Sequence, residues 1–191
     1  MLPMPQEDGC DVYSADADYE KCADSGVTYT SDPMERDMEI AGNAMADMFA
    51  ASSTDDMELH ISVRVLLPDG RELVYQSPTQ IDPRPVIVGA LKASHRALDQ
   101  ELTRIDSPFY LHTKEACRKL TPGEVVECPV GTFPSAFRVP KGARLQLRIV
   151  PVDPVFVAYD SHTYRPGAVN KVYYGKSHPS YLQIPVLPDN H

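Results

Sequence analysis

Eighteen prolines divide this 191-residue chain into short segments. Proline lacks a backbone N–H and clashes with the preceding turn, so helix interiors and central strands exclude it. Only residues 93–105 are predicted as a short helix, which Asp106-Ser107-Pro108 would end. We therefore expect the chain to be built mainly from short strands.

A period of two dominates the segments between the prolines. From residue 59 to 67, the apolar residues Leu59, Ile61, Val63, Val65 and Leu67 alternate with mostly polar neighbours, which predicts a strand with these five side chains in the core. Further strand-like runs are residues 27–30, 43–51, 72–76, 85–90, 125–130, 144–150, 155–159, 169–174 and 181–186. Because no β–α–β alternation appears, these runs predict an all-β antiparallel sandwich of the jelly-roll type with at most one or two short helices.

The length of the chain and the distribution of its charges indicate how many domains it contains and where they begin. Residues 1–58 carry 15 acidic and 2 basic side chains, whereas the remaining residues carry 12 acidic and 16 basic ones. We interpret residues 1–26 as an acidic tail or linker and residues 27–191 as one domain. We interpret the acidic part as a solvated surface, and a docking surface for a basic partner is the less favoured alternative. An acidic chain is poorly suited to nucleic acid.

No apolar run approaches the roughly 18 residues of a membrane span, and the polar N-terminus is unlike a secretory signal. We therefore expect a soluble protein, with a slight preference for the cytoplasm over other compartments.

The four cysteines do not form a zinc motif. Cys10 and Cys22, like Cys117 and Cys128, are too far apart for the C-x(2–4)-C spacing of structural zinc. A tight turn centred on Pro122-Gly123 would make Cys117 and Cys128 cross-strand neighbours that can be oxidised to a disulfide.

The residues needed for catalysis are not found. A serine hydrolase of the α/β type needs a G-x-S-x-G nucleophile elbow, and none occurs. Ser161-His162 and Ser177-His178 are adjacent pairs, but adjacent side chains on a strand point to opposite faces. Asp160 with His162 and His178 could be metal ligands only if the fold brought them together. We therefore predict no catalytic, cofactor-binding or metal-binding residue.

The aromatic residues Tyr173, Tyr174 and Tyr181 near His178 are the best candidate for a contact surface. Core packing explains most of such a cluster, and binding of a sugar or a protein is the alternative. Of two consecutive strand tyrosines, one should face the core and the other should face outward.

Several stretches, in order along residues 27–188, resemble the C-terminal domain of the Xaa-Pro dipeptidyl-peptidase and cocaine-esterase-like serine hydrolases, the CocE/NonD family, whose relatives include α-amino-acid ester hydrolases. The stretches are VTYTSDPME at 27–35 with MEIAG at 38–42, SST at 52–54 with Asp56 and Glu58, PDGR at 68–71, GALKASHR at 89–96, LTPGEVV at 120–126, PSAFR at 134–138 with GARL at 142–145, and HPSYL at 178–182 with IPVLP at 184–188.

The resemblance implies a galactose-binding-like jelly roll packed on an α/β-hydrolase domain that carries the catalytic serine, aspartate and histidine. That domain precedes this one in the family and is not in the chain, which agrees with the missing nucleophile elbow. The chain departs from the family at Val65-Leu66, where Asp-Val is usual, at Ala143, where histidine is usual, and at residues 155–160, where the proline and arginine of a family loop are missing.

The preferred function is an accessory domain that is not catalytic alone, shapes the substrate pocket and stabilises the catalytic domain or an oligomer. Its partner would be an α/β-hydrolase catalytic domain in the same chain or in trans, with a homo-oligomer left open and with no cofactor, nucleic acid or membrane. The alternatives are a free-standing carbohydrate- or peptide-binding sandwich and an interaction protein from a split gene.

Overall fold

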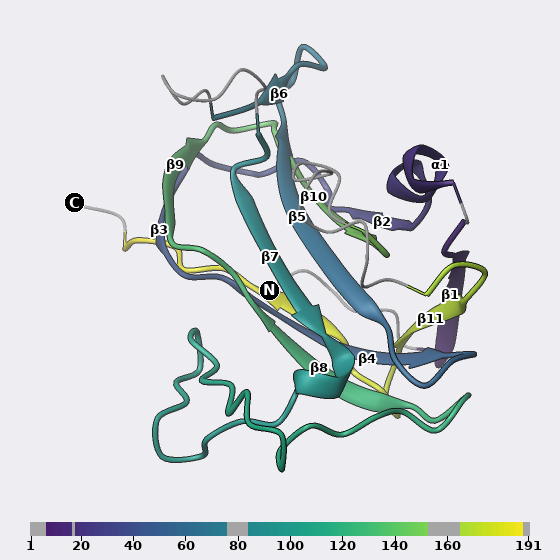
Figure 1. Ribbon diagram of the computed structural model, residues 1–191. Helices are drawn as coiled ribbons and strands as arrows, with labels where there is room; N and C mark the ends of the chain where they lie inside the picture. Colours follow the sequence, from purple (N-terminus) through teal and green to yellow (C-terminus); the bar gives the residue numbers. More distant parts are fainter. Residues whose placement is uncertain (1–6, 17, 76–83, 153–164, 189–191) are drawn as a thin grey trace.

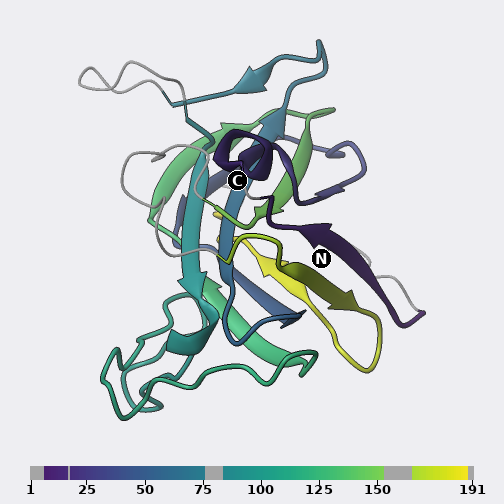
Figure 2. The same ribbon diagram turned by 45° about the vertical axis from the view of Figure 1, so that its right-hand side comes forward.

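Two antiparallel sheets packed face to face make up the molecule. The computed structural model describes residues 7–16, 18–75, 84–152 and 165–188. The elements are β1 (Gly9–Ser14), α1 (Tyr19–Asp24), β2 (Val27–Thr30), β3 (Met38–Gly42), β4 (Met45–Ser52), β5 (Glu58–Leu66), β6 (Glu72–Leu73), β7 (Ile87–Lys92), the 3₁₀ helix η1 (Ala93–His95), β8 (Val126–Gly131), β9 (Ser135–Val139), β10 (Arg144–Val150), β11 (Val169–Tyr174) and β12 (Tyr181–Gln183). The predicted all-β sandwich is confirmed (Figures 1 and 2).

The strand order places β4 and β5 at the centre of the two sheets. In the first sheet β1 pairs with β11 and β11 pairs with β4, while β8 and β12 also pair with β4. In the second sheet β2 pairs with β10 and β10 pairs with β5, while β6 and β7 also pair with β5. A separate ribbon of β3 and β9 lies at one end of the sandwich (Figure 1).

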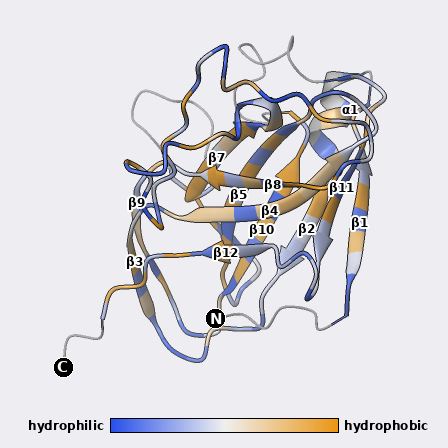
Figure 3. Cartoon of the chain, turned by 90° about the horizontal axis from the view of Figure 1, so that it is seen from below, coloured by the Kyte–Doolittle hydropathy of each residue, from blue (hydrophilic) through white to orange (hydrophobic). Residues whose placement is uncertain are grey.

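The predicted inward face of β5 is confirmed. Leu59, Ile61, Val63 and Val65 are buried, and Leu67 packs partly buried against the same core. Figure 3 shows the hydrophobic colour along several strands, β7 and β8 among them. The opposite face of β5 is also covered at its start, where His60 Nε2 lies 3.1 Å from Glu58 Oε2.

The N-terminal segment differs from the prediction of a tail. Residues Gly9–Ser14 form β1, which pairs with β11 over six positions, and Tyr13 is buried in the main core. Cys22, on α1, is buried with Ala15, Val152 and Ala168 in a second small core. The acidic composition hid this strand because its inward residues, apart from Tyr13, are polar or small. The division at residue 26 stays a prediction.

The helix predicted over residues 93–105 is wrong. Only Ala93–His95 is helical, as a single 3₁₀ turn. Asp99 Oδ1 instead accepts the N–H groups of Glu101 and Leu102 at 2.9 and 3.0 Å, a local turn that competes with helix formation. The strand-like run at 155–159 lies outside the described residues.

The predicted pairing of Cys117 with Cys128 is also wrong. Cys128 lies in β8 opposite Met48, while Cys117 lies in a turn in which its N–H is donated to the carbonyl of Thr113. Cys10, Cys22, Cys117 and Cys128 are all free thiols. The chain before the Pro122-Gly123 turn is not a strand, so the symmetric hairpin on which the pairing depended does not form.

The two sheets meet at one edge through glycines of β7 and β8. Gly89 bridges to Thr132, and the N–H of Phe133 is donated to the carbonyl of Val88. A side-chain carbon at Gly89 would lie only 2.3 Å from the carbonyl oxygen of Gly131. Glycine is therefore required here for a close approach of two backbones. In the described part of the chain, no helix is long and apolar enough to cross a membrane.

Candidate docking surface

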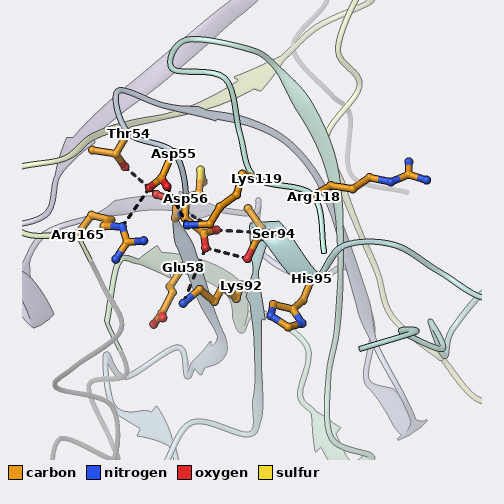
Figure 4. Close-up of polar contacts among 12 residues, drawn as sticks. Thr54, Asp55, Asp56, Glu58, Lys92, Ser94, His95, Arg118, Lys119 and Arg165 are labelled. Atoms are coloured by element: carbon orange, nitrogen blue, oxygen red, sulfur yellow. Dashed lines mark hydrogen bonds and ion pairs between the residues drawn. The ribbon is translucent and has the colours of Figure 1, made fainter. Parts of the chain in front are cut away.

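A long loop without strands or α-helix joins η1 to β8 over residues 96–125, and a buried carboxylate fixes its start. Asp56 is 2% exposed. Its Oδ1 accepts the N–H groups of Met57 and Ser94, both at 3.0 Å, and its Oδ2 accepts the Ser94 hydroxyl at 2.7 Å. Lys92 Nζ lies 3.8 Å from Oδ2 (Figure 4). Two chain segments 38 residues apart are thus locked together before the loop begins.

The returning arm of the loop is held to the same place. Arg118 donates its N–H to the carbonyl of Ser94, and Leu120, which is buried, donates its N–H to the carbonyl of Asp55. Lys119 Nζ lies 2.8 Å from Asp55 Oδ2 on the exposed side (Figure 4). Both ends of the loop therefore rest on the segment that precedes β5.

Between these ends, residues 97–111 fold back on themselves as an irregular hairpin. Asp99 donates its N–H to the carbonyl of Phe109, and Leu111 donates its N–H to the carbonyl of Ala97. The Tyr110 hydroxyl donates to the carbonyl of Pro129 at 2.6 Å and accepts the N–H of Gly131 at 2.8 Å. Tyr110 thus satisfies backbone groups of β8 that have no strand partner.

Several large apolar side chains are exposed along this loop and just after β8. Leu102, Ile105, Phe109 and Leu111 are exposed, with Ile105 at 75%, and Phe133 just beyond β8 is 71% exposed. A side-chain carbon at Gly131 would lie 2.8 Å from Pro108, so the arm that carries Phe109 lies beside the end of β8. We call these five residues the loop patch. In Figures 1 and 2 the loop extends from the end of the sandwich opposite β6.

The predicted aromatic cluster exists only in part. Tyr173 lies opposite Phe49 in the sheet, and the His178 ring packs at a tilt against Tyr173 and edge-on against Phe49, with ring centroids 5.3 Å and 5.5 Å away. Tyr174 lies against Gly9. Phe49 was not singled out from the sequence because its place beside Tyr173 depends on the register between β4 and β11. Neither Tyr173 nor Phe49 is among the core residues, so the interpretation of the cluster as core packing is not confirmed, and binding of a sugar or a protein stays a prediction.

Tyr181 belongs to a neighbouring polar group around Asp47. Burial first, and then the charge of Glu127, raise the pKa of Asp47 to about 6, while a hydrogen bond from the Tyr181 hydroxyl opposes the rise. Asp47 is 7% exposed, and its Oδ1 has no hydrogen-bond partner. The ionised carboxylate is therefore poorly solvated at neutral pH.

We expect Asp47→Asn to stabilise the domain at pH 7 by about 1–3 kcal/mol, since a shift of one pKa unit corresponds to about 1.4 kcal/mol. Between pH 4 and pH 6 this carboxyl ionises in the unfolded chain before it ionises in the folded one, so its contribution to stability falls as pH rises. Urea unfolding of both proteins between pH 4 and 7 measures this difference. Glu127→Gln removes a charge that raises the pKa of Asp47, so the stability of this variant should fall less steeply between pH 4 and pH 6. Equal stabilities of wild type and Asp47→Asn at pH 7 would contradict the assignment.

The remaining reactive groups do not form a catalytic set in the described part of the chain. Ser177 donates its hydroxyl and its N–H to Asp8, not to His178. Burial raises the pKa of the Cys128 thiol to about 12 and also raises that of Cys22, which keeps both thiols protonated. No group of three metal-ligating side chains occurs among the described residues. Asp160, Ser161 and His162 lie outside them, so the prediction that no residue is catalytic or binds metal stays a prediction.

Comparisons of sequence and structure with known proteins show the family to which this chain belongs. Residues 4–183 match the model of the X-Pro dipeptidyl-peptidase C-terminal non-catalytic domain, and the chain belongs to this family. It is 24% identical over 165 residues to the "Putative serine esterase" of Mycobacterium bovis. This alignment covers 84% of this chain and 24% of that protein.

Two solved structures share the fold. A CocE/NonD family hydrolase from Staphylococcus aureus superposes with a TM-score of 0.83 at 23% identity, over 97% of this chain and 34% of that one. An α-amino acid ester hydrolase superposes with a TM-score of 0.57 at 17% identity, over 84% of this chain and 25% of that one. The chain thus spans about a quarter to a third of the length of these larger proteins.

Proposed function

We propose that this chain is the accessory domain of a larger serine hydrolase and docks on its catalytic domain through the loop patch. The observation that carries the proposal is the match of residues 4–183 to a domain described as non-catalytic and C-terminal in X-Pro dipeptidyl-peptidases. The limited share of the hydrolases that the chain spans supports a catalytic domain as the missing partner.

The loop patch supports the choice of surface. Exposed large apolar residues scattered singly need no explanation, whereas a contiguous apolar patch marks an interaction site, and four of the five loop-patch residues lie on one projecting segment. The loop is fixed at its start by buried hydrogen bonds to Asp56 and along its course by the partly buried hydrogen bonds of Tyr110, so the patch is presented in a defined position. A rigid surface loses less entropy on docking than a flexible one. In this role the domain stabilises the catalytic domain and borders its substrate pocket.

The test is co-expression with the α/β-hydrolase domain encoded in the same protein or in the neighbouring reading frame. The chain alone should not hydrolyse p-nitrophenyl acetate or an Xaa-Pro p-nitroanilide, because no acyl-enzyme can form by the route of the family without a nucleophile elbow. Together the two parts should copurify and turn over one of these substrates. The triple variant Leu102→Asp, Ile105→Asp and Phe109→Asp should weaken the association at least tenfold, because charged side chains would have to be desolvated in the interface.

Val12 provides the matched control. It is 54% exposed on β1, in the edge strand of the first sheet, so Val12→Asp adds a charge at an apolar position outside the loop. We expect this variant to associate like the wild type and both variants to melt like it. Unchanged association of the triple variant would contradict the loop patch as the docking surface. Turnover by the isolated chain, or binding to glycans without any hydrolase partner, would contradict the accessory role.

A further inference from the structure

Two imidazole rings face each other at the base of the loop. His95 is the last residue of η1, and His112 follows the arm that carries Phe109 and Tyr110. Their Nδ1 atoms are 3.3 Å apart, whereas the ring centroids are 5.4 Å apart. The nitrogen atoms are therefore on the facing edges of the two rings.

This separation suits two ligands of one metal ion. Metal–nitrogen bonds of about 2.0–2.1 Å at tetrahedral angles hold two nitrogen atoms about 3.3–3.4 Å apart. Without a metal ion, one of these two nitrogens can donate a hydrogen bond to the other at the same distance. We propose that His95 and His112 form a two-histidine site for a divalent transition-metal ion of the zinc type, with water in the other coordination positions.

Contacts outside the pair hold the backbone next to both rings in place, and those on the His95 side are buried. His95 follows Ser94, which is 1% exposed and bound twice by Asp56. His112 follows Leu111 and Tyr110, which are fixed by the Ala97 carbonyl and by the edge of β8. Tyr110 also packs on the His112 ring, with centroids 5.4 Å apart. The site is thus formed before a metal ion binds, which favours affinity.

Among the described residues, the facing nitrogens hydrogen-bond only to each other. The nearest charged residue in sequence, Arg96, donates its Nη1 to the carbonyls of Ala93 and Arg118. In Figure 4 the His95 ring lies apart from the cluster of Asp55, Asp56 and Lys119. Two imidazoles without carboxylates select Zn²⁺, Ni²⁺ or Cu²⁺ over Mg²⁺ and Ca²⁺. A bound ion would connect the base of the loop to the arm that carries the loop patch.

The test is calorimetric titration of the metal-stripped chain with Zn²⁺ and Ni²⁺. We expect one ion per chain and no binding of Mg²⁺. His95→Gln and His112→Asn should each weaken binding at least tenfold, because a single imidazole cannot chelate. Asparagine is chosen at residue 112 because its φ of 47° is a conformation that asparagine tolerates. His178→Gln, in the aromatic cluster of the first sheet, and Cys117→Ser, at the exposed thiol of the loop, are the controls and should bind like the wild type.

Hydrogen exchange supplies a second readout that a surface-bound ion elsewhere would not change. Zn²⁺ should slow exchange of the amides of Asp99 and Leu111, and this effect should be lost in His112→Asn. The proposal is wrong if no saturable binding occurs, if binding persists in both histidine variants, or if the loop amides exchange equally with and without Zn²⁺.

Discussion

Asp56→Ala is expected to destabilise the domain by about 3–5 kcal/mol, the range found when one member of a buried polar network is removed. The carboxylate accepts three hydrogen bonds from Met57 and Ser94, and all of these groups are buried. Removing it leaves three donors without partners, each at a desolvation cost of about 1–3 kcal/mol where no water replaces the carboxylate. Equilibrium urea unfolding followed by circular dichroism measures the loss.

Its neighbour provides the matched control. Asp55 is exposed and its carboxylate contacts Lys119 and Arg165 on the surface. Asp55→Ala should unfold at the same urea concentration as the wild type, because exposed ion pairs contribute little to stability. A similar loss in both variants would show that charge, not the buried network, matters at this position. Ser94→Ala should fall between the two, since it removes the hydroxyl donor and keeps the N–H donor.

The repeating part of the fold could be predicted from the sequence because burial in a sandwich repeats with the strand. The alternation from Leu59 to Val65 defines both a strand and its inward face, and the structure agrees at each of these positions. The same reasoning missed β3 and β9, which are short, and β1, whose pattern is not apolar. Strands of this kind are specified by their partners in space, which a pattern within the strand does not contain.

The candidate site was less predictable because its residues are far apart in the sequence. Asp56 and Ser94 both lie in stretches that resemble the hydrolase family, but their contact joins positions 38 residues apart. His95 and His112 are joined only because the loop folds back at Asp99 and Phe109. The loop patch was missed for a different reason, since residues 93–105, which carry Leu102 and Ile105, were predicted as a helix. The signal available was the aspartate at position 99, a residue that favours turns over helix interiors.

The junction of β7 and β8 gives the second large effect. We expect Gly89→Val to destabilise the domain by about 3 kcal/mol, at the upper end of the usual cost of overpacking. The new side chain would lie 2.3 Å from the carbonyl oxygen of Gly131 and 3.1 Å from Thr132 Cα. These are backbone atoms, and they cannot easily move, because Thr132 Oγ1 accepts the N–H of Ala44 and donates to its carbonyl.

The control is the next residue, because Ala90 is exposed on the same strand. Ala90→Val adds a similar volume and a residue that strands favour, so its stability should stay close to that of the wild type. Gly89→Val should also displace the loop, because Pro108 lies against Gly131 and directly precedes Phe109 of the loop patch. We therefore expect weaker association with the catalytic domain even below the melting temperature. A Gly89→Val protein with wild-type stability would contradict the close approach of the two sheets at this edge.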